Sequence, residues 1–197
     1  MSARHGISFE PFLWNGFFIF MIMEKLLVET HPFGAFVPKN IRCLIVGSFP
    51  GREQTQCDID ETHWFYGAPR NQFWKILEIV YGRELKNREQ KQGLFEKAGI
   101  GITDVIRSCV RKLGTNLDEN LDIKEYNTDT IAGILKKHKP LVLFTSRFVE
   151  KQFRKLFPDY LHTDILPSPS PRYFKLSIAD KAKIYRKKLP VIAGIRK

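Results

Sequence analysis

The feature that most constrains this chain is a series of four short predicted strands, two of them wholly apolar, each separated from the next by a segment with helical periodicity. The apolar runs lie at Cys43–Val46 and in "LVLF" at 141–144, and the other two strands are predicted near Ile100–Ile106 and within "YLHTDIL" at 160–166. A run that is apolar on both faces is typical of a strand buried in a parallel sheet. Strands that alternate with helices predict an α/β fold, a three-layer α/β/α sandwich around a central, mainly parallel four-stranded sheet.

Apolar residues at helical spacing predict the intervening helices. In "NQFWKILEIVYG", Phe73 and Trp74 are predicted core residues, and Gly82 can end that helix. Gly99 can end the next helix in the same way. Further helices are predicted in "TDTIAGILKKHKP", in "RFVEKQFRKLF" and over about Ser177 to Lys188.

A length of 197 residues predicts one α/β domain, which we place at 23–197. The preceding apolar run, Phe12 to Met23, is shorter than the ~20 residues needed to cross a bilayer, and no small-residue cleavage site follows it. We therefore expect no membrane association. We favour a translation start at Met21 or Met23, which makes 1–22 a non-native extension; the alternative is an accessory segment packed on the domain.

Charge and cysteine content narrow the class of partner. The 32 basic residues outnumber the 21 acidic ones, giving +11 and a pI near 9.6, and this balance favours a nucleic-acid partner over a membrane. The alternative is a generic solubilising charge. The spacing of Cys43, Cys57 and Cys109 fits neither a zinc site nor a disulfide framework, so a reducing cytoplasm is expected.

Several catalytic signatures are missing from the sequence. It contains no phosphate-binding loop, no dinucleotide-binding glycine pattern and no zinc-peptidase motif, so mononucleotide hydrolysis, dinucleotide binding and zinc-peptidase chemistry lack their signatures. A serine nucleophile is conceivable at Ser48 or Ser168, but the spacing assigns neither a histidine nor an acid as its partner.

Three segments rich in proline, glycine and polar residues remain: "GSFPG" at 47–51, "YGAPRNQFW" at 66–74 and "LPSPSPR" at 166–172. Because ligands of open parallel sheets bind beyond the carboxyl ends of the strands, we expect the loops after Val46, Ile102 and Leu166 to surround one crevice. Rigid loops that present amides and hydroxyls suit an oxyanion or a phosphate. The alternative is that the prolines only stiffen surface turns.

These motifs together resemble the uracil-DNA glycosylase superfamily, and most of all its hypoxanthine-DNA (deoxyinosine) glycosylase branch, with similarity to the mismatch-specific uracil-DNA glycosylases. The resemblance runs from about His31 to the last predicted helix. It implies a cytoplasmic, nucleoid-associated and monomeric repair enzyme that needs neither metal nor cofactor. Its partner would be DNA containing a damaged base, which it flips out of the duplex before hydrolysing the N-glycosidic bond.

The first motif places Phe49 where classical uracil enzymes carry an Asp or Asn that positions water. Phenylalanine cannot do this, and the hypoxanthine branch implies that Asn71 is catalytic instead. Without the resemblance, a helix N-cap is an equally good role for Asn71. Tyr66 matches the aromatic that stacks on the flipped base. The residues that would shape the backbone around the base are Gly47, Ser48 and Pro50.

The second motif can be aligned with either Leu166 or Ser168 at the position of the histidine that stabilises the base anion in uracil enzymes. We prefer Ser168. The expected DNA-contacting residues are Ser170, Pro171 and Arg172, together with Arg70. Thr103 and Asp104 match positions that read the base edge; Asp104 alternatively serves as an ordinary strand-end carboxylate. Ala68 departs from the histidine that often precedes this proline in relatives.

Three functions therefore remain for test. The favoured one is a monofunctional DNA glycosylase that removes a deaminated base. Hypoxanthine is favoured over uracil because neither alignment of the second motif supplies the histidine that stabilises the uracil anion. The second is a catalytically silent nucleic-acid-binding module of the same fold. The third is a small-molecule nucleoside enzyme, for which a charge of +11 would be needless.

Overall fold

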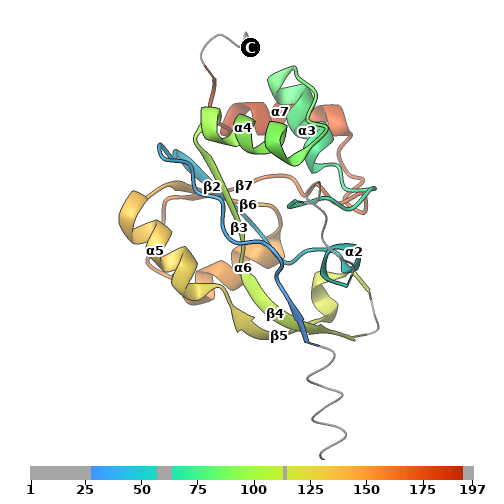
Figure 1. The fold of residues 1–197 in the computed structure, drawn as a ribbon, viewed down its shortest axis with the longest axis vertical. Helices are drawn as coiled ribbons and strands as arrows, with labels where there is room; N and C mark the ends of the chain where they lie inside the picture. The colour runs from blue at the N-terminus through green and yellow to red at the C-terminus, as the bar shows by residue number, and fades with distance from the viewer. Residues whose placement is uncertain (1–27, 57–63, 113–114, 193–197) are drawn as a thin grey trace, which may run out of the picture.

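A computed structural model of the chain describes residues 28–56, 64–112 and 115–192 (Figure 1). The predicted extension 1–22, the favoured start at Met21 or Met23, and Cys57 lie outside these residues.

The centre of the molecule is a four-stranded sheet in which every neighbouring pair is parallel. Its order is β3-β2-β6-β7, with Ile45 of β2 beside Ile102 of β3 and Leu143 of β6. β2 is buried along its whole length. The strands are β2 (Cys43–Gly47), β3 (Ile100–Asp104), β6 (Leu141–Phe144) and β7 (Thr163–Ile165). The apolar runs therefore predicted the central sheet correctly.

Helices cover both faces of this sheet (Figure 1). Because successive strand residues point to opposite faces, Cys43 and Ile45 join the core under one helical layer, whereas Leu44 and Val46 join the core under the other. The first layer contains α3 (Phe73–Tyr81), α4 (Arg88–Ala98) and α7 (Ile178–Lys188). The second contains α5 (Thr128–His138) and α6 (Arg147–Leu156). The predicted three-layer α/β/α sandwich is confirmed.

The helix ends follow local sequence signals. Gly82 and Gly99, directly after α3 and α4, have φ angles of 62° and 68°, which glycine adopts without a Cβ penalty. Ser146 and Ser177 cap α6 and α7, each accepting a backbone N–H three residues further along. The sequence therefore predicted these boundaries closely.

A second, antiparallel sheet was not predicted. It consists of β1 (Val28–Thr30), β4 (Ile106–Arg111) and β5 (Leu121–Tyr126), in the order β1-β4-β5. The strand predicted near Ile100–Ile106 is present as β3 but ends earlier, because the chain leaves the parallel sheet after Asp104. There Val105 and Ile106 donate backbone hydrogen bonds to the carbonyls of Gly47 and Ser48.

Two short elements complete the described structure. They are α2 (Arg52–Thr55), directly after the first motif, and the 3₁₀ helix η2 (Asp118–Asn120), between β4 and β5. Within the described segments, every helix is too short or too polar to traverse a bilayer.

Candidate functional site

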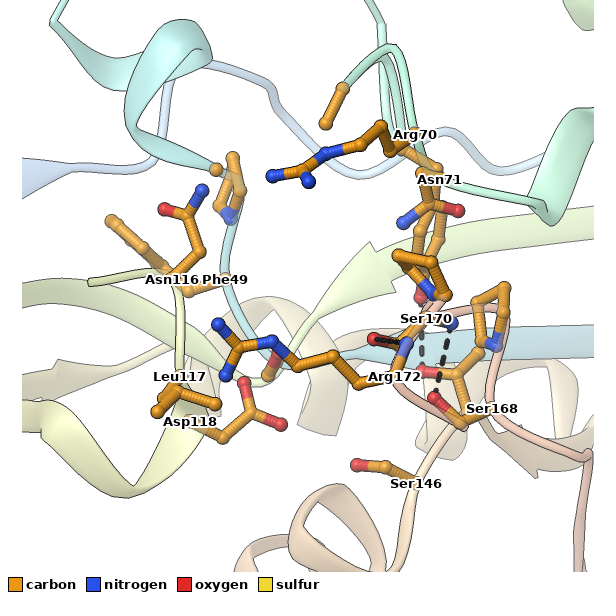
Figure 2. A pocket seen from close by; sticks show the side chains of 18 of the residues that line it. Phe49, Arg70, Asn71, Asn116, Leu117, Asp118, Ser146, Ser168, Ser170 and Arg172 are labelled. Atoms are coloured by element: carbon orange, nitrogen blue, oxygen red, sulfur yellow. Dashed lines mark hydrogen bonds between the residues drawn. The ribbon is translucent and has the colours of Figure 1, made fainter. Parts of the chain in front are cut away.

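A cavity of about 850 Å³ opens beyond the carboxyl ends of the parallel strands. Its walls come from segments that are far apart in the chain (Figure 2). The lining residues lie within 48–54, 65–71, 115–119, 145–148 and 168–173, together with Asp104. The structure thus brings the three predicted loop motifs together around one crevice.

Eleven of the predicted site residues line this cavity, and two do not. The eleven are Ser48, Phe49, Pro50, Tyr66, Arg70, Asn71, Asp104, Ser168, Ser170, Pro171 and Arg172. Gly47 lies directly behind the lining. Thr103 is buried and does not line the cavity, and its hydroxyl accepts a hydrogen bond from the Asn127 amide at 3.0 Å.

Gly47 is the point at which two polar side chains approach the first motif. A Cβ built on Gly47 would lie less than 3.0 Å from both Asp104 Oδ1 and the Tyr66 hydroxyl. Real Cβ atoms essentially never come so close to another heavy atom. A side chain at position 47 is therefore incompatible with the arrangement of Asp104 and Tyr66, and this explains the glycine that ends β2.

Phe49 has an apolar and cationic environment. Its ring meets the His31 ring edge-on at 5.8 Å, and the Arg111 guanidinium carbon lies 5.4 Å from its centroid. Arg111 also donates to the backbone carbonyl of Pro50 and forms a buried ion pair with Glu29 of β1, with 2.9 Å between Nε and Oε2. The second sheet therefore fixes the first motif in place, a role that sequence analysis missed.

Tyr66 has an unusual backbone conformation, with φ at 57°, in the left-handed region that residues other than glycine rarely adopt. Its ring stacks on Phe73, with centroids 4.2 Å apart and planes at 21°. Its hydroxyl donates to Thr145 Oγ1 at 3.0 Å. Burial first, and then the negative charge of Asp104, raise the pKa of Tyr66 well above its ordinary value, so it stays a neutral donor. These contacts hold a flat aromatic surface at the cavity wall.

Asp104 is anchored from behind by a residue that sequence analysis left unassigned. His31 Nε2 lies 2.9 Å from Asp104 Oδ2, and both side chains are 7% exposed. His31 Nδ1 accepts the backbone N–H of Phe33, which assigns the proton to Nε2. Both ring nitrogens are thus engaged, so His31 cannot act as a base for Ser48.

Asn71 performs a capping role and still faces the cavity. Its Oδ1 accepts the backbone N–H of Phe73 at 2.9 Å, although the N-cap position itself belongs to Gln72. Figure 2 shows the amide nitrogen of Asn71 directed toward the cavity. The two alternatives from the sequence, a cap or a catalytic group, are therefore geometrically compatible in one side chain.

The second motif is a tightly turned loop. Ser168 Oγ accepts the N–H of Ser170, and Ser170 Oγ accepts the N–H of Arg172, both at 3.3 Å. These bonds leave the hydroxyl protons available to other acceptors. Leu166 is buried in the core and does not line the cavity, so only the alignment that uses Ser168 places a side chain there.

A buried lysine joins the second motif to the start of α3. The Lys181 ammonium, 0% exposed, donates to Gln72 Oε1 at 2.8 Å and to the carbonyl of Ser170 at 3.3 Å. The backbone N–H of Gln72 in turn donates to the Pro169 carbonyl at 3.0 Å. Lys181 therefore fixes the loop that carries Ser168 relative to Asn71.

Arg70 and Arg172 lie on the wall that carries Asn71 and Ser168. Both are exposed, and Figure 2 shows the Arg172 guanidinium reaching across the cavity toward Leu117 and Asp118. Neither guanidinium forms an ion pair or hydrogen bond within the described part of the chain. Both are therefore available to a negatively charged ligand.

The opposite wall, residues 115–119, was missed by sequence analysis because "TNLDE" matches no motif. Asn116 Oδ1 accepts the backbone N–H of Arg52, which ties this loop to α2. The Ser48 hydroxyl donates to the Asp118 carboxylate. Burial is the main reason why the pKa of Asp118 lies above its ordinary value. In the described segments, no group of three or more His, Cys, Asp or Glu side chains could hold a metal ion.

Comparisons with known proteins identify relatives of this chain. The chain is 28% identical over 122 residues to a protein named hypoxanthine DNA glycosylase from Methanosarcina barkeri, covering 61% of this chain and 73% of that protein. A protein of the same name from Methanosarcina acetivorans is 26% identical over 140 residues, with 70% and 84% covered.

The fold also matches a protein from Methanosarcina acetivorans that was solved by NMR in solution and assigned to the uracil DNA glycosylases. The TM-score is 0.63 at 24% identity, with 81% of this chain and 98% of that chain covered. The sequence model of the uracil DNA glycosylase superfamily matches residues 33–188, which include every predicted site residue. The chain therefore belongs to the uracil DNA glycosylase superfamily.

Proposed function

We propose that this protein is a monofunctional DNA glycosylase that flips a deaminated base, hypoxanthine in the first place, into the cavity and hydrolyses its N-glycosidic bond. The observation that carries the proposal is the meeting of Asn71, Tyr66 and Ser168 in one cavity at the carboxyl edge of the sheet. The names of the two Methanosarcina relatives support the choice of hypoxanthine.

Hydrolysis of the N-glycosidic bond needs hydrogen-bond donors at the leaving base and a polar group that positions the water. Cleavage of the glycosidic bond builds positive charge on the sugar and negative charge on the leaving base, so donors fixed at the base accelerate it. The Asn71 amide and the Ser168 hydroxyl face the cavity and are held by other hydrogen bonds. An amide is a poor base, and Asn71 would therefore act by positioning water or the base and not by removing a proton.

The surroundings of the cavity mouth suit a duplex. Arg70 and Arg172 are exposed and can neutralise phosphates. Phe174, next to the second motif, is 88% exposed, which is unusual for a phenylalanine. An apolar ring beside a base pocket can act as a wedge that fills the gap left by a flipped base. Flipping itself costs a few kcal/mol, least at a mismatch.

Phe49 favours a second candidate, a catalytically silent DNA-binding module. Its ring lies among His31 and Arg111 and offers nothing that could polarise water. In the glycosylase proposal Asn71 must therefore supply the polar group.

One assay separates the two. Purified protein is incubated with duplexes that contain a single hypoxanthine, uracil, xanthine or mismatched thymine, and abasic sites are then cleaved with alkali. The glycosylase proposal expects strand cleavage at hypoxanthine before the other bases. Duplex binding without cleavage at any of the four lesions would favour the silent module.

A further inference from the structure

Asp118 is a carboxyl group in the cavity whose charge nothing in the proposed mechanism uses. Among the described residues, four acidic ones line the cavity: Glu53, Asp104, Asp118 and Glu119. Glu53 and Glu119 are exposed, and Asp104 is held by His31. Asp118 is partly buried, accepts a hydrogen bond from the Ser48 hydroxyl and lines the cavity, where Figure 2 shows its carboxyl group below the Arg172 side chain.

The loop that carries Asp118 is well braced. Thr115 Oγ1 accepts hydrogen bonds from the Leu117 backbone at 3.3 Å and from the Asn120 amide at 2.7 Å. The Asn120 backbone N–H donates to the Leu117 carbonyl at 3.0 Å. Asp118 is therefore fixed against the first motif, where it also accepts the Ser48 hydroxyl.

The charges that face Asp118 come from several elements. Asp104, at the end of β3, repels its negative form, whereas Arg111 of β4 and the Ser48 hydroxyl favour that form. Burial outweighs these attractions and raises the pKa of Asp118. The remaining charged groups around the cavity are Arg70 and Arg172 on the opposite wall, Glu53 of α2 and the neighbouring Glu119.

We propose that Asp118, in its protonated form, is the general acid that protonates the leaving purine; this role rests on the glycosylase function proposed above. The proton passes from the Asp118 carboxyl to N7 of hypoxanthine, and the C1′–N9 bond breaks with its electron pair moving to N9. Water adds to C1′ and releases one proton, which returns to Asp118 through solvent. The base leaves neutral, so no separate anion-stabilising histidine is required.

This role explains a preference for purines. Hypoxanthine has a basic ring nitrogen at N7, whereas uracil has none. General acid catalysis is typically worth 10²- to 10⁴-fold in rate. An acid at Asp118 would therefore accelerate loss of hypoxanthine far more than loss of uracil.

The test compares hypoxanthine with 7-deazahypoxanthine, in which N7 is replaced by a carbon that cannot take a proton. Single-turnover excision from otherwise identical duplexes is measured for the wild type, for Asp118→Asn and for Asp159→Asn. Asp159 is exposed in the turn after α6 and serves as the control. Asp118→Asn should excise hypoxanthine about 10²- to 10⁴-fold more slowly than the wild type does. On the 7-deaza base, the rates of Asp118→Asn and of the wild type should be nearly equal, because that base cannot take a proton from Asp118. Asp159→Asn should match the wild type on both.

The pH dependence gives a second readout. Wild-type excision should fall as the pH rises through the raised pKa of Asp118, and Asp118→Asn should lack this descending limb. If Asp118→Asn does not fold, Ser48→Ala replaces it. Loss of the Ser48 hydrogen bond removes a contact that favours the ionised carboxyl, so the descending limb should move to higher pH.

Each failure has its own signature. Wild-type activity on hypoxanthine with an unchanged rate in Asp118→Asn overturns the role of Asp118 and leaves the glycosylase function intact. If Asp118→Asn slows excision of hypoxanthine and of the 7-deaza base by the same factor relative to the wild type, the role of Asp118 as general acid is overturned as well. No excision of any base by the wild type overturns the proposed function itself, and with it the role of Asp118.

Discussion

Replacing Gly47 by alanine tests whether the cavity is as tightly built as its contacts indicate. The added Cβ would require both Asp104 Oδ1 and the Tyr66 hydroxyl to withdraw by more than about half an ångström to reach 3.0 Å. Neither can move freely, because His31 holds Asp104 at 2.9 Å and Thr145 holds Tyr66 at 3.0 Å. Overpacking of this kind costs about 1–3 kcal/mol. In a chain of this size, that lowers Tm by about 2–12 °C.

The loss of activity should exceed the loss of stability. A displacement of about 1 Å near the reacting atoms can cost about 10²-fold in rate, so hypoxanthine excision by Gly47→Ala should fall by that order. Thermal unfolding and single-turnover excision are measured on the same preparations. Gly133→Ala in α5 is the matched control, since a Cβ there meets nothing within 4 Å and should stabilise the helix by up to about 1 kcal/mol with unchanged excision. A Gly47→Ala protein with wild-type Tm and wild-type rate would refute the reasoning.

Three further variants address the proposed function. Asn71→Ala should abolish excision and lower the free energy of unfolding by about 1 kcal/mol, because it removes the acceptor for the Phe73 N–H. Asn71→Ser should keep much of that stability but not the activity. Full excision by either variant removes Asn71 from the mechanism. Arg172→Ala should weaken duplex binding and reduce the slope of log K against log[salt] by about 1, measured by fluorescence titration; an unchanged slope argues against a phosphate contact. Phe174→Ala should leave Tm unchanged because the ring is 88% exposed, yet slow excision from duplex more than from single-stranded DNA; equal effects on both substrates contradict a wedge.

Local sequence signals predicted the parallel sheet and the helix boundaries well. The apolar runs at 43–46 and 141–144 became β2 and β6, the two central strands of the sheet, since a strand covered on both faces is mostly apolar. Gly82 and Gly99 ended their helices as predicted, because the backbone preference that stops a helix resides in the residue itself. The antiparallel sheet escaped prediction because its strands, "VET", "IRSCVR" and "LDIKEY", mix polar and apolar residues and contain no continuous apolar run.

By itself, then, the sequence determined the layers of the fold and the edge of the sheet at which the three loop motifs meet, because burial and backbone preference are encoded locally. Only the tertiary structure decided which polar groups face one another. His31 and Asp104 are 73 residues apart, and Arg111 and Glu29 are 82 apart. Asp118 acquires its significance only when η2 packs against Ser48. Such pairs depend on chain closure and on burial of charge, and both exist only once the whole core has formed.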